Sequence, residues 1–204
     1  MKTILSAALA LAMGIAAAPV FAQSAGDFTL GFGFHTVNPK SNNGTVAGAR
    51  ADISNSVRPT FTFEYFIKDN LGIEVLAALP FEHKVSLAGL GDVATVKQLP
   101  PVVSIQYHFA NETKFTPFLG AGVNYTKFFS QDTEGAIAGN KINVDDSWGL
   151  ALHAGVDYAI TEHGSLRADV RWIDISSDVK LNGNKIGQVD VNPWVFGMAY
   201  VYRF

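Results

Sequence analysis

Few side chains in this sequence are placed to perform catalysis or to bind a metal. The chain has no cysteine, which excludes cysteine nucleophiles, cysteine-ligated metals and disulfides. His163 and Ser165 are the nearest match to a base with its nucleophile, but they lie in a predicted short turn without a carboxylate to orient the histidine. The remaining histidines lack the spacing of metal ligands; they are His35, His83, His108 and His153. We therefore expect no enzyme, no catalytic residue, no metal and no cofactor.

Charged residues form a second group with possible chemistry, because they recur on one face of otherwise apolar segments. They are Glu64, Glu74, Asp157, Arg167, Asp169 and Arg203. Opposite charges that share a confined interior should pair with one another. If the surrounding segments are strands that direct these side chains into a narrow barrel, the charges predict a polar plug in its periplasmic half.

The flanking elements have the period-two alternation of β-strands. In residues 28–34, phenylalanine or leucine occupies every second position. Seven further segments follow the same pattern, at residues 60–67, 71–79, 99–109, 115–125, 148–160, 166–172 and 194–204. Most of them reach the roughly 9 to 11 residues of a tilted membrane-spanning strand. The sequence thus predicts an all-β fold of eight strands.

The connections between these strands alternate in length, as the turns and loops of outer-membrane barrels do. Residues 68–70, 110–114 and 161–165 form short turns, whereas residues 39–56, 81–98, 128–145 and 176–190 form long connections rich in Gly, Asn, Ser or Asp. An open sheet edge in lipid would leave backbone groups unpaired, so the sheet must close. We expect an antiparallel up-and-down transmembrane β-barrel with both termini on the periplasmic side.

Residues 1–22 have the features of a cleaved signal peptide. Lys2 precedes an apolar stretch from Ile4 to Ala18, and residues 20–22 form a small-x-small cleavage site ending at Ala22. Residues 23–204 would then form the barrel in the cell outer membrane. Beyond residue 22, no stretch approaches the roughly 18 apolar residues of a membrane-spanning helix. A formal net charge of -3 gives no basic excess for nucleic acid.

A soluble lipocalin-like barrel is the alternative architecture, since it also has eight strands. It would place the larger apolar side chains inside, around a ligand. The opposite face of these strands consists of glycine and charged residues and is too small and polar to serve as a soluble exterior. Aromatic residues also gather at the strand ends, as in membrane girdles; examples are Tyr65, Tyr107, Tyr158, Trp148 and Trp194.

At this level of detail the chain resembles the OmpW/AlkL family of outer-membrane proteins. The matching stretches are residues 69–78 (DNLGIEVLAA) with 80–81, 91–96 (GDVATV) with 99–101 (LPP), 117–126 (PFLGAGVNYT), 146–149 (DSWG) and 193–196 (PWVF). The resemblance implies an eight-stranded barrel that passes small hydrophobic molecules inward. In that family a narrow apolar channel opens sideways into the membrane, because the bore is blocked below.

Higher on the inward face the side chains become apolar, and they suit either a hydrophobic ligand or simple filling of a narrow barrel. The residues are Leu76, Ala78, Val102, Ile173, Ile175 and Val195. By resemblance, Leu76 matches a hydrophobic residue that gates the family channel. The opposing gate position is usually aromatic but is Arg171 here, and we expect Glu74 or Asp169 to pair with this guanidinium.

Three prolines mark a possible lateral opening. Pro80 ends the third predicted strand, and Pro100 and Pro101 begin the fourth. Proline has no amide donor for a sheet ladder, so the two strands could separate here; equally, the prolines could simply mark strand ends. The resemblance favours an opening.

The sequence therefore predicts a porin-like channel for passive uptake of small hydrophobic molecules. The alternative is a non-transporting OmpX-like barrel with a structural or adhesive role, which long loops with protruding paired strands would favour. Expected partners are outer-membrane lipid, small hydrophobic ligands and, during biogenesis, the outer-membrane insertion machinery. The last expectation rests on the alternating aromatic ending Tyr200, Tyr202 and Phe204.

Overall fold

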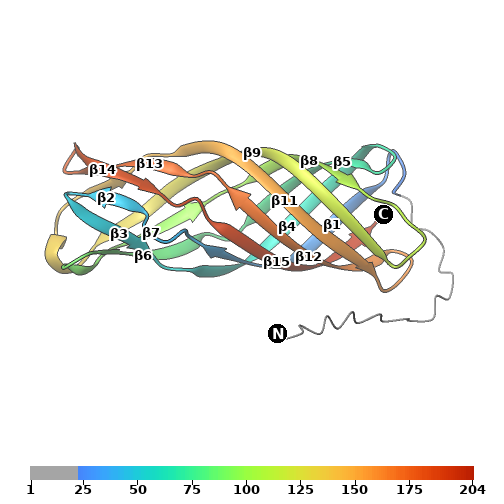
Figure 1. Ribbon diagram of the computed structural model, residues 1–204, viewed down its shortest axis with the longest axis horizontal. Coiled ribbons are helices and arrows are strands. Elements are labelled where there is room, and N and C mark those ends of the chain that lie inside the picture. Colours follow the sequence, from blue (N-terminus) through green and yellow to red (C-terminus); the bar gives the residue numbers. More distant parts are fainter. Residues whose placement is uncertain (1–22) are drawn as a thin grey trace, which may run out of the picture.

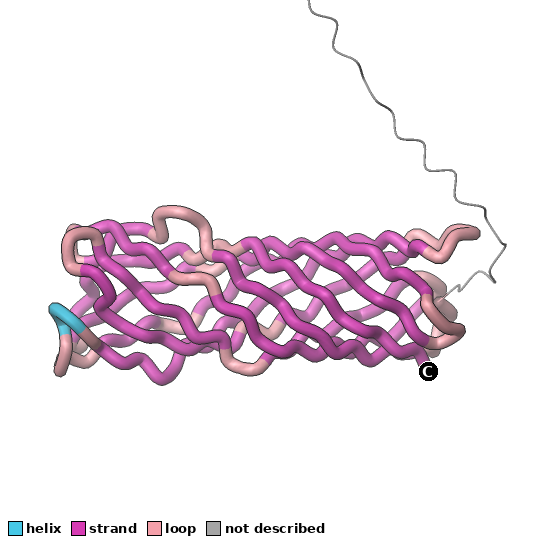
Figure 2. The backbone as a smooth tube through the Cα atoms, turned by 90° about the horizontal axis from the view of Figure 1, so that it is seen from below, coloured by secondary structure: helices cyan, strands magenta, loops and turns pink. Residues whose placement is uncertain are grey.

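The computed structural model describes residues 23–204, and the predicted signal peptide of residues 1–22 lies outside this range. The described chain forms one long tube of antiparallel strands (Figure 1). Strand backbone runs along almost the whole tube, with loops mainly at its two ends (Figure 2). Within residues 23–204, no helix combines the length and the apolar character needed to cross a membrane.

Eight strands close the lower part of the tube into a barrel. They are β1 (Phe28–Asn38), β4 (Ser56–Lys68), β5 (Leu71–Ala78), β8 (Val102–His108), β9 (Phe115–Thr133), β11 (Ser147–Ala159), β12 (Gly164–Ile173) and β15 (Trp194–Arg203). Each pairs with the next in this order, and β15 closes the barrel on β1 from Thr29↔Arg203 to Asn38↔Trp194. The predicted fold class, a closed eight-stranded antiparallel meander, is confirmed.

The alternation in sequence becomes an alternation between lipid and interior. On β1, Phe34 is 54% exposed, whereas the next residue, His35, is 2% exposed. The same pattern holds on β8, where Ile105 and Tyr107 face outward while Gln106 and His108 are buried. The lower barrel therefore has an apolar outer surface and a polar interior.

The described chain begins and ends at the same end of the barrel. The amide of Asn70, in the turn between β4 and β5, donates to the carbonyl of Gln23, and the amide of Phe204 donates to Phe28. Asn70 has a φ of 61°, a left-handed conformation that asparagine tolerates in tight turns. The short turns and the C-terminus thus define the periplasmic end (Figure 1).

The segments predicted as long loops are strands that extend the barrel, so that part of the prediction was wrong. They form β2 (Gly44–Val46), β3 (Ala49–Ile53), β6 (Phe81–Leu87), β7 (Gly91–Leu99), β10 (Ile142–Val144), β13 (Ser176–Leu181) and β14 (Asn184–Asp190), with a 3₁₀ turn η1 (Gly135–Ile137). Together with the upper part of β9 they make a second wall, in the order β10-β13-β14-β2-β3-β6-β7-β9. Their turn-forming residues occupy only the hairpin tips, whereas the residues between the tips alternate.

The upper barrel reverses the polarity of the lower one. Glu82 and Lys84 on β6 are exposed, whereas Leu87, Val93 and Val96 point inward and are at most 6% exposed. Beyond the upper aromatic residues Trp148 and Trp194, the outer surface therefore has the character of a surface in water. The upper barrel stands above the membrane as a hollow extension with an apolar lining.

Pairing is interrupted where β5 and β8 continue into β6 and β7. The β5–β8 ladder ends at Leu76↔Val102, and the β6–β7 ladder begins at Phe81↔Gln98. No described backbone hydrogen bond joins residues 77–80 to residues 99–101. The three prolines lie in this interval and contribute no amide donors. The wall of the barrel therefore has a local gap in its hydrogen bonding.

A second interruption lies between β9 and β10, the two edge strands of the upper wall. Within the described chain no strand pairing joins them; the side chain of Gln131 does so instead. Gln131 Oε1 accepts a hydrogen bond from Val144 N at 2.6 Å, and its Nε2 lies 3.4 Å from Val144 O. A side-chain amide thus substitutes for a backbone ladder at this seam.

Candidate functional site

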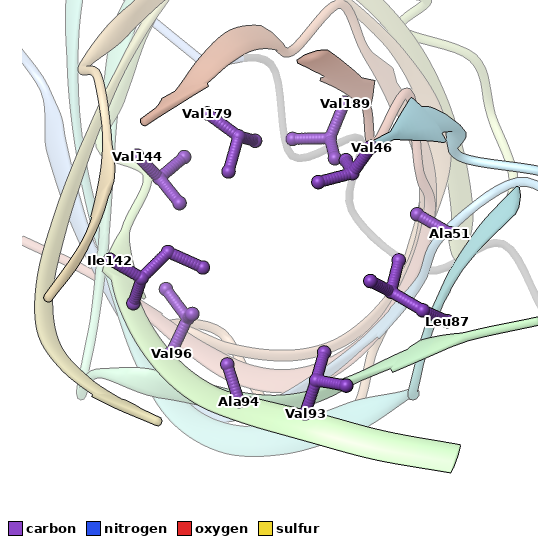
Figure 3. Packing of buried hydrophobic residues seen from close by; sticks show 10 residues of the cluster. All are labelled: Val46, Ala51, Leu87, Val93, Ala94, Val96, Ile142, Val144, Val179 and Val189. Atoms are coloured by element: carbon purple, nitrogen blue, oxygen red, sulfur yellow. The ribbon is translucent and has the colours of Figure 1, made fainter. Parts of the chain in front are cut away.

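An apolar cavity of about 100 Å³ occupies the upper barrel. Ten buried residues from seven strands point into the space that they enclose (Figure 3): Val46, Ala51, Leu87, Val93, Ala94, Val96, Ile142, Val144, Val179 and Val189. All of them belong to segments that the sequence analysis assigned to long loops, so this cavity was missed. The available signal was the recurrence of apolar residues at every second position, as at Ile142 and Val144 on β10 and at Ala94 and Val96 on β7.

Two polar side chains interrupt the lining of this cavity, His83 on β6 and Gln98 on β7. They are 4% and 1% exposed. The two Nε2 atoms lie 3.0 Å apart, and Nδ1 of His83 lies 2.5 Å from the carbonyl oxygen of Ser54. Because that oxygen can only accept, Nδ1 carries the proton and Nε2 of the neutral ring accepts from Gln98.

The surroundings of His83 hold its imidazole in the neutral form. Burial lowers the pKa of His83 below its usual 6.5, and the nearby positive charge of Arg58 lowers it further, against the opposing effect of the hydrogen bond to Ser54. A desolvated cation is costly unless it is paired. The floor of the upper cavity is therefore polar but uncharged.

Below this pair lies a second apolar layer, which contains the channel residues predicted from the sequence. Leu76, Val102, Ile173, Ile175 and Val195 are buried together, and Ala78 packs against them. A cavity of only about 10 Å³ remains between them and Pro100. Such a space is about the size of one water molecule. The structure contains two separate apolar cavities rather than a continuous tunnel.

Phe81 stands between the two cavities. Its side chain is 2% exposed, lines the lower cavity and stacks beside His83 with ring centroids 6.5 Å apart. Phe81 is also the first paired residue above the gap between the β5–β8 and β6–β7 ladders. Its aromatic ring therefore adjoins three features: the floor of the upper cavity, the lower cavity and this gap. Arg58 lies beside the same gap and donates from Nε to the carbonyl of Pro80 at 2.8 Å.

A network of buried charges fills the lower barrel, centred on Arg167. Its guanidinium binds both oxygens of Asp157, at 2.7 and 2.9 Å, and Glu74 at 2.8 Å. Glu64 lies 3.6 Å away. All four side chains are nearly or fully buried. Bidentate contacts of this kind are the strong form of the arginine–carboxylate pair, and they leave no apolar path through the lower barrel.

Arg171 joins the same network from above, and it bonds to both of its predicted partners. Nε donates to Asp169 at 2.7 Å, and Nη1 donates to Glu74 at 2.8 Å. Arg171 is fully buried. Its side chain thus forms the top of the charged network instead of facing Leu76 across the apolar layer.

The network includes polar residues beyond the six predicted ones. His108 lies 2.9 Å from Glu64, and Gln106 connects Glu64 with His153. His35, on β1, lies 3.2 Å from Asp169. His35 was not counted in the predicted plug, although its place on the inward face of the first strand was readable.

Arg203 differs from the other predicted plug residues, because it lies at the periplasmic rim. Its side chain is 22% exposed and 3.9 Å from Asp27, and it lines a polar recess at the barrel end. Its position as the last residue of β15 explains this placement. The other five predicted residues, with Arg171, form one connected network.

Glycines on the inward face make room for these large polar side chains. A Cβ atom at Gly72 would lie 2.3 Å from Oε1 of Glu64, and one at Gly120 would lie 2.0 Å from Nε2 of His153. Neither distance is compatible with a side chain larger than hydrogen. The combination of glycine with charge along the inward face is therefore a packing requirement of the network.

Comparison with known proteins agrees with this architecture. The OmpW family model matches residues 24–204. Outer membrane protein W of Escherichia coli is 38% identical, with 100% of each chain covered. The crystal structure of OprG from Pseudomonas aeruginosa superposes with a TM-score of 0.79 at 36% identity, covering 89% of this chain and 97% of that one. The resemblance expected from the sequence is confirmed, and the location is the outer membrane.

More distant relatives are similar in sequence. Outer membrane protein AlkL of Ectopseudomonas oleovorans is 27% identical over 79% of this chain and 72% of its own length. The dibenzothiophene metabolism operon protein PahQ of Pseudomonas aeruginosa is 28% identical over 67% of this chain and 65% of its own. These proteins are outer-membrane barrels and their relatives, not enzymes.

Proposed function

The chain belongs to the OmpW family of outer-membrane barrels, and from this premise we propose that it is a channel for passive uptake of small hydrophobic molecules. The observation that carries the proposal is the apolar cavity of the upper barrel, which lies above a second apolar layer and, below that, a closely packed network of charges. A molecule that enters this cavity from outside meets apolar walls first and buried ion pairs below.

The energetics of the cavity favour apolar ligands. Each square ångström of apolar surface removed from water contributes about 25 cal/mol, whereas a polar solute would lose hydrogen bonds to water on entering. The cavity is lined by apolar side chains apart from His83 and Gln98. The name of the relative PahQ refers to the metabolism of dibenzothiophene, an apolar aromatic compound, which supports the same ligand class for this chain.

Because the charged network blocks the lower barrel, a hydrophobic ligand in the channel can leave only sideways, through the barrel wall. Leu76, Val102 and Val195 would line the path below the upper cavity, with Arg171 as its floor. The unpaired interval at Pro80, Pro100 and Pro101 would be the opening into the outer leaflet, because no described backbone hydrogen bond joins the two segments to each other there. Phe81 would have to move aside, since it separates the two cavities.

The alternative function is an adhesive or structural barrel of the OmpX type. One observation favours it: the upper strands project beyond the membrane as paired hairpins. Against it stands the apolar interior of those hairpins, which an adhesive surface does not require. Uptake measurements separate the two functions.

The test compares uptake of a fluorescent hydrophobic reporter by cells that express the variants. Replacing the three prolines with valine restores amide donors, so the ladder should close and uptake should fall several-fold while the barrel still assembles. Leu76→Arg should block the path itself by placing an unpaired charge in an apolar constriction. If the proline variant transports normally and Leu76→Arg does not, the exit lies elsewhere. Normal uptake by both would leave the structural function.

We also propose that the insertion machinery binds the last strand. The side chains of Tyr200 and Tyr202 on β15 and of Phe204, the residue after this strand, are 39 to 55% exposed and form an alternating aromatic ending. During biogenesis this ending would be the recognised feature, and lipid would replace the machinery on the same face after insertion.

A further inference from the structure

The polar pair His83 and Gln98 has no role in the function proposed above. The other inward residues of β6 and β7 are apolar, among them Leu87, Val93 and Val96. A buried polar group costs free energy unless it is hydrogen-bonded. The placement of two such groups together in an otherwise apolar cavity therefore needs an explanation.

The hydrogen-bonding capacity of the pair is not exhausted. His83 uses both ring nitrogens, one toward the carbonyl of Ser54 and one toward Gln98. An amide side chain offers two N–H donors and a carbonyl oxygen with two lone pairs. The described structure records one hydrogen bond of the Gln98 side chain, which uses a single donor. Gln98 keeps one N–H and its oxygen for a third group.

We propose that Gln98, positioned by His83, selects apolar molecules that carry one uncharged hydroxyl group. This inference rests on the proposed function, because the ligand must reach the upper cavity. A hydroxyl both donates and accepts, which matches the remaining oxygen and N–H of Gln98. The apolar lining suits the rest of such a molecule.

The charge of the site argues against an ionised ligand. The side chains that line the cavity include no acidic or cationic residue, and burial lowers the pKa of His83, so its ring is neutral near pH 7. Arg58 is engaged with the backbone oxygens of Pro80 and Val57. A carboxylate would lose its hydration here without gaining a cation, whereas a hydroxyl loses much less.

If His83 and Gln98 had a purely structural role, their replacement would have a different effect on uptake. The β6–β7 hairpin already has ladder pairing from Phe81↔Gln98 to Leu87↔Gly91. If His83 and Gln98 only stabilised this hairpin, their replacement would affect all ligands equally. Selectivity between two ligands that differ by a hydroxyl group therefore separates the two explanations.

The test measures uptake of naphthalene and 2-naphthol, which have nearly the same shape and differ by one hydroxyl group. Cells that express the full chain are compared with cells that carry the empty vector. Gln98→Met keeps the length of the side chain and removes its hydrogen-bonding groups. Because one hydrogen bond is lost, the protein-dependent uptake of 2-naphthol should fall about three- to tenfold, while naphthalene uptake should not fall.

The matched control is Gln188→Met, the same substitution at an exposed position on β14, which should change neither uptake. His83→Phe keeps an aromatic ring but removes the nitrogens that hold Gln98. As expected for a positioning residue, this variant should reduce the preference for 2-naphthol and leave naphthalene uptake intact. Heat-modifiable mobility reports assembly of each barrel, and Gln98→Leu replaces Gln98→Met if the latter does not assemble.

Equal effects on both probes, or no effect of Gln98→Met on an assembled barrel, would overturn the selectivity and leave the channel intact. Wild-type uptake of both probes at the level of the empty vector would instead overturn the proposed function, and the selectivity with it. The two failures are thus distinguishable in one experiment.

Discussion

The lower and upper halves of this barrel are both built from antiparallel strands, of which only β9 runs through both, but the two halves are opposite in polarity. In the lower half, apolar side chains such as Ile105 face outward and charged ones such as Arg167 face inward. In the upper half, Lys84 faces outward and Val96 faces inward. The period of two holds along most of each half, apart from local irregularities such as the adjacent buried residues Val93 and Ala94 on β7, so the main difference lies in which face is apolar.

The comparison shows that the medium around each half, lipid or water, decides which face of its strands is apolar. Lipid surrounds the lower half, so its polar side chains must satisfy one another inside. Water surrounds the upper half, which therefore buries apolar residues as a soluble barrel does. The reversal at the level of the upper aromatic residues marks the membrane boundary. A charged residue on the outer face, or the loss of a charge, should therefore destabilise the lower half much more than the upper half.

Removing a charge from the lower interior should have the largest effect. Arg167→Met leaves Asp157, Glu74 and Glu64 without their shared cation, and breaking a buried ion pair in this way costs about 3 to 5 kcal/mol. The free energy of unfolding, measured by urea titration in lipid, should fall by this amount. The control is Arg50→Met, which removes an exposed ion pair to Asp52 from the outer face of the upper barrel and should cost less than about 1 kcal/mol. Equal losses would contradict the comparison.

Adding a charge to the outer face should have the second-largest effect, because it should lower the free energy of unfolding in the lower half but not in the upper half. Ile105→Lys places an ammonium group in lipid, because Ile105 is 57% exposed on β8, and such a change costs about 2 to 4 kcal/mol near the bilayer midplane. Thr45→Lys adds the same charge to the outer face of β2, where the side chain is exposed, and should be nearly neutral. Urea titration of both variants provides the measurement. A large cost at Thr45 would mean that the upper strands lie in lipid.

The smallest expected effect is a dependence of the upper half on pH. The folded state lowers the pKa of His83 from its usual 6.5, so the folded state binds fewer protons than the unfolded state below that value. The upper barrel should keep full stability above pH 6.5 and lose stability as the pH falls toward the lowered pKa. Amide exchange in β6 and β7 at pH 7.5 and 5.5 measures this loss.

The control for the pH effect is His83→Gln, which cannot titrate. Exchange in this variant, corrected for the intrinsic rate, should not accelerate at the lower pH. If wild type and variant accelerated equally, protonation of a group other than His83 would be responsible.

The sequence was sufficient to predict the lower barrel, because its strands place contrasting residues on two faces and its turns are short. The same approach failed for β6 and β7. There the turn-forming residues at and near the hairpin tip, such as Gly89 and Asp92, obscured the alternation of Ala94, Val96 and Gln98. Five of the six predicted charges belong to the network around Arg167, whereas Arg203 lies at the rim. The geometry of the network could not be predicted, since which carboxylate binds which guanidinium depends on strand register. The position of Phe81 between two cavities was not predictable from spacing.

The seam at Gln131 has a mechanical consequence. A cylinder whose wall is continuous can widen only by stretching, which here means breaking backbone ladders along a whole strand. A cylinder that is slit along one line widens by bending, like a split ring. The upper barrel is closed between β9 and β10 by side-chain contacts from Gln131 to Val144 and from Thr133 to Asn140. Its bore can therefore expand around a bulky guest at the expense of a few side-chain hydrogen bonds, while the ladders of the other strands remain intact.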